Sequence, residues 1–189
     1  MIGRGGVGWG PACRAAWGLS AGPQGCCLLQ VVSAERGESA GSGRIGGDRV
    51  DFKLEVVPSL TNSGGSLHGG AQATLVDTLT TTALSAAQAH ENLLAGDSEV
   101  ESRDRGTTSL RVDYMDGGRP GETVFISATV DRVGGSLCFL SAEIYNVREG
   151  GRRTVLSKGS HLKALSRSGG KTPAEPILQA ISAKQRPKL

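Results

Sequence analysis

A pair of glycines and a nearby aspartate carry the clearest chemical signal in this sequence. Gly69 and Gly70 stand at the start of a predicted helix, and Asp77 follows Gly70 by seven residues. Glycines there leave backbone N–H groups unobstructed, and these groups together with the helix dipole attract the oxyanion that an attacked carbonyl becomes. An unpaired carboxylate is costly to bury in an apolar helix unless something uses or solvates it. Asp77 is therefore a candidate base or nucleophile, and the glycines are candidate oxyanion donors.

The separation of these groups along one helix predicts a site shared by two copies of the chain. At a rise of about 1.5 Å per residue, Asp77 lies roughly 10 Å from Gly70. That is too far for Asp77 to act on a carbonyl group held at the start of its own helix. Two subunits packed about a two-fold axis can instead place Asp77 of one opposite Gly69 and Gly70 of the other. We therefore expect a homodimer with two equivalent sites.

Helical periodicity marks the segment that carries these residues, and strands are predicted on both sides of it. Apolar residues recur at helical spacing between Ala73 and His90. The strand candidates are residues 28–33, 50–57, 107–114, 122–132, 136–147 and 153–165. Residues 91–105 are polar and are predicted to be an exposed loop. Two strands, one helix and four strands joined by short turns predict an α+β fold with an antiparallel sheet of about six strands.

Length and composition predict one domain with an extension at each end. The chain has 189 residues, of which 38% are hydrophobic, and this suffices for one core at residues 28–165. Residues 1–27 contain two arginines and no acid, so they are predicted to be a disordered or targeting extension. Residues 166–189 are predicted to be a disordered basic tail. The chain ends in Pro-Lys-Leu, close to a peroxisomal address, which leaves mitochondrion, cytoplasm and peroxisome all open.

Charge and residue spacing weigh against three other classes of protein. The formal net charge of +3 comes from the ends of the chain, so the predicted domain lacks the basic, aromatic face of a nucleic-acid-binding protein. No stretch approaches the roughly 18 consecutive apolar residues of a membrane-spanning helix, so no integral membrane contact is expected. His68, His90 and His161 are far apart, and the four cysteines contain no CxxC pair, so we expect no metal.

A family resemblance is carried by four segments: TNSGGSLHGGAQATLVDTLTTTAL, TTSLRVDYM, GETVFISATV and GGSLCFLSAEIYN. Together they resemble the hotdog thioesterases of the PaaI-like type and, within them, the acyl-coenzyme A thioesterase 13 group, over about residues 28–165. The resemblance implies a hotdog fold, in which a curved antiparallel sheet wraps one long central helix. It also implies a homotetramer made of two dimers, and hydrolysis of acyl-CoA without a metal or an organic cofactor.

The same resemblance assigns roles to individual residues. Asp77 matches the general base or nucleophile, and Gly69 matches a backbone donor that polarises the thioester carbonyl. Asn62 matches a residue that helps to orient water and substrate. Thr107 stands where the family often has a serine, contributed by the subunit that supplies Asp77.

Substrate contacts are expected at both ends of the acyl-CoA. Gly70 and His68 are expected beside the reacting group. His68 has two interpretations: an acid-base residue, as in hotdog dehydratases, or a junction residue that bonds the backbone, which we favour. Gly135 replaces a basic residue that relatives commonly carry near the CoA phosphates. Phosphate binding is therefore expected to fall to Arg132, Lys158 or another cation.

Three functional hypotheses follow. The first is hydrolysis of medium- to long-chain fatty acyl-CoA to a free fatty acid and CoA, with Asp77 as the essential residue. The second is a hotdog hydratase or dehydratase that acts on acyl thioesters through His68. The third is a protein that binds acyl-CoA without turnover. Release of the CoA thiol distinguishes the first from the other two.

Overall fold

The structure is a computed structural model that describes residues 29–35, 37, 46–94 and 99–173. The predicted extension at residues 1–27 lies outside these ranges, as does the chain beyond residue 173. Among the described residues, no helix is both long and apolar enough to cross a membrane.

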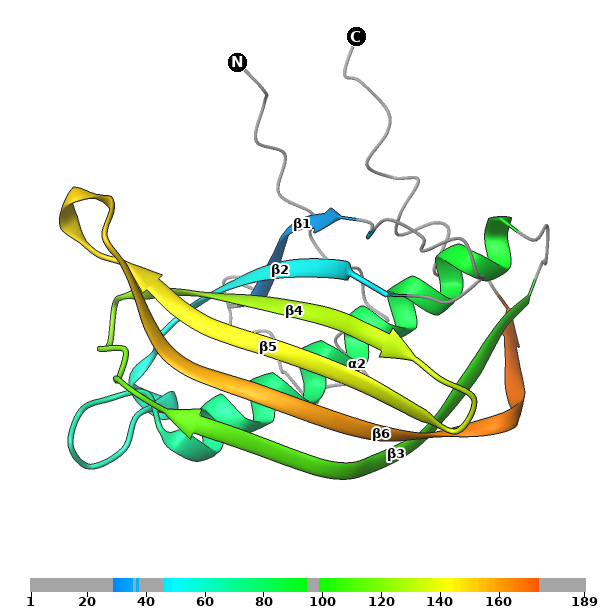
Figure 1. The fold of residues 1–189 in the computed structure, drawn as a ribbon. Helices are drawn as coiled ribbons and strands as arrows, with labels where there is room; N and C mark the ends of the chain where they lie inside the picture. Colours follow the sequence, from blue (N-terminus) through cyan, green and yellow to red (C-terminus); the bar gives the residue numbers. More distant parts are fainter. Residues whose placement is uncertain (1–28, 36, 38–45, 95–98, 174–189) are drawn as a thin grey trace, which may run out of the picture.

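One α-helix lies across the concave face of a curved six-stranded sheet (Figure 1). In chain order the elements are β1 (Leu29–Glu35), β2 (Asp48–Glu55), the 3-10 helix η1 (Pro58–Leu60), α2 (Gly69–Leu94), β3 (Glu99–Tyr114), β4 (Thr123–Val133), β5 (Leu137–Val147), the 3-10 helix η2 (Glu149–Gly151) and β6 (Arg153–Pro173). The strands are ordered β1-β2-β4-β5-β6-β3, and every neighbouring pair is antiparallel. The predicted α+β architecture is confirmed.

The position of β3 decides which residues can meet. This strand follows α2 in the chain but pairs with β6, at the far edge of the sheet from β1 (Figure 1). In this pairing Thr107 stands opposite Lys163, and Leu110 stands opposite His161. Parts of the chain that are far apart in sequence therefore reach the same stretch of α2.

The two largest boundary differences from the sequence prediction are at the start of β3 and the end of β6, and both come from the pairing of these strands. The loop predicted for residues 91–105 is wrong, because α2 continues to Leu94 and β3 begins at Glu99. The strand predicted to end at Leu165 continues to Pro173, within the segment predicted to be a disordered tail. Glu99 pairs with Pro173, so each segment supplies the hydrogen-bonding partner of the other. These segments lack the apolar alternation by which strands are recognised in sequence, so only their long-range pairing identifies them as strands.

The core forms between the sheet and the inward face of α2. Alternate residues of β4 are buried beneath the helix, as expected for a sheet with one covered face. Cys138 of β5 is fully buried in this core. Gly159 of β6 permits a close contact with the helix, because a Cβ atom there would lie 2.4 Å from Val76 Cγ1. The turn of α2 that carries Asp77 is thereby held directly against β6.

Candidate active site

The loop before α2 is closed by the side chain of Asn62. Asn62 Oδ1 accepts hydrogen bonds from the backbone N–H groups of Gly64, at 2.9 Å, and Ser66, at 3.2 Å. The backbone N–H of His68 donates to Leu60 O at 2.8 Å, which ties the end of the loop to its beginning. The side-chain oxygen of Asn62 thus shapes the loop, and Asn62 as a whole is exposed.

His68 makes the backbone hydrogen bond that the junction interpretation predicts. Its Nδ1 atom accepts the N–H of Gly70 at 2.8 Å. This occupies the Gly70 N–H and places the proton of the neutral imidazole on Nε2. Within the described part of the chain, no acceptor is recorded for the N–H of Gly69. Gly69 is therefore the better candidate for an oxyanion donor of the two glycines.

Tyr114, at the end of β3, holds the same helix turn and was not singled out from the sequence. Its hydroxyl donates to Gly69 O at 3.1 Å, and its ring lies 3.5 Å from the position of a Cβ atom on Gly69. The side chains of Tyr114 and Met115 are exposed. The first turn of α2 is thus fixed by a neighbouring strand and bordered by apolar surface.

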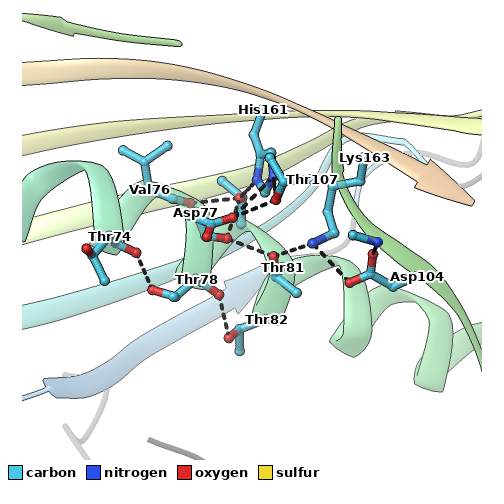
Figure 2. A network of polar contacts seen from close by, with 12 residues as sticks. Thr74, Val76, Asp77, Thr78, Thr81, Thr82, Asp104, Thr107, His161 and Lys163 are labelled. Carbon is cyan, nitrogen blue, oxygen red and sulfur yellow. Dashed lines mark hydrogen bonds and ion pairs between the residues drawn. The ribbon is translucent and has the colours of Figure 1, made fainter. Parts of the chain in front are cut away.

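Asp77 and Thr107 are brought together within one chain, as Figure 2 shows. Thr107 Oγ1 donates to Asp77 Oδ1 at 3.0 Å. The Asp77 side chain is 41% exposed, and among the described residues Oδ2 has no recorded hydrogen-bond partner. One carboxylate oxygen is held in place while the other is free to bind water or substrate.

His161 completes this group and was not predicted as a site residue. Its Nε2 atom lies 2.9 Å from Thr107 Oγ1 and 3.3 Å from Asp77 Oδ1, and its side chain is fully buried (Figure 2). One sequence signal could have indicated it: the period of two in β6 places His161 on the same face as Gly159 and Leu165, toward the helix. A histidine on a buried face needs polar partners.

His161 lies between two hydroxyl groups, and its surroundings favour the neutral imidazole. Thr80 Oγ1 lies 2.7 Å from His161 Nδ1 and 2.7 Å from Val76 O, and Thr107 Oγ1 lies 2.9 Å from His161 Nε2. Burial, followed by the charge of Lys163, lowers the pKa of His161, although the charges of Asp77 and Asp104 act in the opposite direction. At neutral pH the imidazole is therefore neutral, and it can accept a hydrogen bond from one of the two hydroxyls and donate one to the other.

Consecutive threonines of α2, Thr80 to Thr82, bring hydroxyl groups to the surface that faces β6. Thr80 supports His161, as described above. Thr81 Oγ1 donates to Asp77 O at 2.7 Å and accepts from Lys163 Nζ at 2.9 Å. Two of the three hydroxyls thus connect α2 to β6 beside Asp77.

The two cations predicted to bind CoA phosphates lie on the outer face of the sheet and near the end of β4. Lys158 alternates with the inward-facing Gly159 and is exposed on the outer face of the sheet, where its Nζ atom lies 3.3 Å from Glu143 Oε2. Arg132 is exposed near the end of β4, beside a bulge. Their role in phosphate binding stays a prediction. In the described ranges, no group of three or more His, Cys, Asp or Glu side chains could hold a metal.

Comparison with known proteins gives a consistent result. The sequence model of the thioesterase superfamily matches residues 64–151. Acyl-coenzyme A thioesterase 13 of Homo sapiens is 31% identical over 121 residues, which cover 62% of this chain and 73% of that protein. Zebra fish thioesterase superfamily member 2 matches with a TM-score of 0.54 and 27% identity, over 74% of this chain and 82% of that one. The E. coli PaaI protein matches with a TM-score of 0.54 and 16% identity, over 84% and 86%.

These matches confirm the resemblance seen in the sequence. The region matched by the superfamily contains Gly69, Asp77 and Thr107. The PaaI protein, at its low identity, shows a shared fold, and the human relative is covered over more than two thirds of its length. The chain belongs to the thioesterase superfamily and has its hotdog fold.

Proposed function

We propose that this protein hydrolyses the thioester bond of acyl-CoA to release a carboxylic acid and CoA. The observation that carries the proposal is the half-exposed Asp77 carboxylate, with Oδ1 held by Thr107 beside His161 and Oδ2 unpaired among the described residues. A carboxylate oxygen in this state can accept a proton from water. Membership of the thioesterase superfamily, and the name of the human relative, support a thioester of CoA as the substrate.

The proposed site is shared between two subunits. Gly69 and Asp77 lie on one continuous helix, so their separation of roughly 12 Å prevents them from acting on the same carbonyl group. A two-fold axis places Gly69 of one subunit opposite Asp77 of the partner subunit, and two such sites form in each dimer. We propose that two of these dimers form a homotetramer.

The proposed reaction uses water as the nucleophile. The thioester carbonyl oxygen accepts a hydrogen bond from the Gly69 N–H. Asp77 Oδ2 of the partner subunit takes a proton from a water molecule while the oxygen of that water bonds to the carbonyl carbon. The tetrahedral oxyanion then collapses and breaks the C–S bond. The proton on Asp77 passes to the departing sulfur, so the products are the carboxylic acid and the CoA thiol, and Asp77 is again ionised.

The Thr107 hydroxyl and His161 support the water route over direct attack by Asp77. The single hydroxyl proton of Thr107 faces both Asp77 Oδ1 and His161 Nε2. When Asp77 gains a proton on Oδ2, Oδ1 can still accept from Thr107, so this hydrogen bond is kept. Asp77 can therefore carry the proton from the attack of water until the C–S bond breaks.

The test is a parallel assay of the full chain with saturated medium- and long-chain acyl-CoA and with the matching 2-enoyl-CoA. We expect free thiol and carboxylic acid to appear in equal amounts from the saturated substrates, because no double bond is needed for hydrolysis. Loss of the enoyl absorbance with the thioester intact would instead indicate a hydratase. Saturable binding of acyl-CoA by the folded protein with no thiol release would indicate a binding protein.

A further inference from the structure

A buried lysine lies beside the proposed site and has no part in the mechanism above. Lys163 of β6 is 4% exposed, and its Nζ atom lies 3.0 Å from Asp104 Oδ2 on β3 and 2.9 Å from Thr81 Oγ1 on α2 (Figure 2). Lysine is almost never fully buried unless it is paired. An ion pair in such a place is weak evidence for stability, because desolvation opposes the attraction of the charges. The contacts of its two partners indicate what the pair does.

The Asp104 partner controls the backbone just before Thr107. Asp104 Oδ1 accepts the N–H of Gly106 at 2.8 Å, while Oδ2 faces Lys163. Gly106 has a φ of 117°, which a side chain would strain, and the register of β3 shifts on both sides of it. Thr107 follows this bulge in the chain, and its hydroxyl donates a hydrogen bond to Asp77 Oδ1. The ion pair therefore holds the bulge that aims the Thr107 hydroxyl.

The Thr81 partner controls the helix turn of Asp77. The Thr81 hydroxyl donates its proton to Asp77 O, so its oxygen is free to accept from Lys163. Lys163 thus contacts both β3 and α2, the two elements whose side chains meet at Asp77 Oδ1.

We propose that the Lys163–Asp104 ion pair is a positioning device, which sets the Thr107 hydroxyl against Asp77 and balances the charge around His161. This inference rests on the proposed function, because it assigns the pair to the hydrolytic site. Neither residue touches the reacting atoms in this account. They act through Thr107, Thr81 and His161.

The charges that face His161 come from every element around it. Asp77 faces it from α2, Asp104 from β3 and Lys163 from its own strand, and all three act on its pKa. Cys138 of β5 stands opposite Lys163, and burial raises the pKa of its thiol to about 12, so it adds no charge. The charge of Lys163 lowers the pKa of His161 and that of Asp104 raises it. The two members of one ion pair thus have opposite electrostatic effects on the same imidazole.

The test compares Lys163→Met with Asp104→Asn in the full chain, with the exposed Lys53→Met on β2 as a control. Both site variants should lower kcat, by up to about 10²-fold, with KM little changed, because a displaced Thr107 misaligns the reacting groups. Protonation of His161 places a positive charge beside Asp77 and changes the hydrogen bonds of Thr107, so activity should fall at low pH. Lys163→Met raises the pKa of His161 and should move this acid limb to higher pH, whereas Asp104→Asn should move it to lower pH. Lys53→Met should match the wild type.

Nuclear magnetic resonance of the histidine side chains measures the change in the pKa of His161 without substrate. The His161 titration should move up in Lys163→Met and down in Asp104→Asn. Shifts in the same direction, or no shift in either folded variant, would overturn the proposal. If Lys163→Met does not fold, the direction of the shift in Asp104→Asn decides alone. A wild type without acyl-CoA turnover would overturn the proposed function, while the histidine titration would still test the electrostatic coupling.

Discussion

Asp77→Asn is expected to lower kcat for acyl-CoA hydrolysis by about 10²- to 10⁴-fold, the usual contribution of a general base. The asparagine amide cannot accept the proton of the attacking water. Its oxygen can still accept from Thr107, as Asp77 Oδ1 does, so the local packing is retained. KM should change little, because Asp77 acts on the water more than on the bound ground state.

Thiol release by the two proteins, measured over a range of acyl-CoA concentrations, checks this prediction. A thermal unfolding curve and an acyl-CoA binding isotherm serve as controls for folding and for the pocket. Full activity in the variant would remove Asp77 from the mechanism. Single turnover in ¹⁸O-labelled water separates the two routes, because the label enters the product acid when water attacks and enters Asp77 when the carboxylate attacks.

Gly69→Pro is expected to lower kcat by about 10²- to 10³-fold, as removal of one oxyanion donor does in other hydrolases. Gly69 is the first residue of α2, and proline is well tolerated at that position of a helix. The substitution removes a backbone N–H for which the described residues provide no recorded acceptor. The carbonyl of residue 69, which accepts from Tyr114, is retained.

Gly69→Ala is the matched control, because it adds a side chain and keeps the N–H. An added Cβ would lie 3.5 Å from the Tyr114 ring, which is an ordinary van der Waals contact. Kinetic constants close to the wild type are therefore expected for the alanine variant. Equal losses in the proline and alanine variants would show that space at this turn, and not the hydrogen bond, is what matters.

Much of the fold could be predicted from the sequence because its pattern is local. The helix was visible in the periodicity after Gly70, and β4 in its strict alternation. The strand β3 shows the limit of this approach. Its beginning is polar, and it is a strand because β6 pairs with it, which no local pattern records. The same pairing carried β6 past its predicted end at Leu165.

The site residues likewise fall into those that the sequence indicated and those that only the long-range pairing of strands brings together. Gly69 and Asp77 could be found because they share one helix, and Thr107 because of the family resemblance. His161, Lys163 and Asp104 were not found, since they reach Asp77 only after β3 crosses to the edge of the sheet.

The most direct test of the shared site is to combine the two inactive variants, Asp77→Asn and Gly69→Pro, by co-expression with different affinity tags. Each mixed dimer then has one site with both native residues, so random pairing should restore about a quarter of wild-type activity, carried by the doubly tagged dimers. A doubly tagged dimer that forms but has no activity above its parents would contradict the account, because it would place Gly69 and Asp77 of one subunit in the same site.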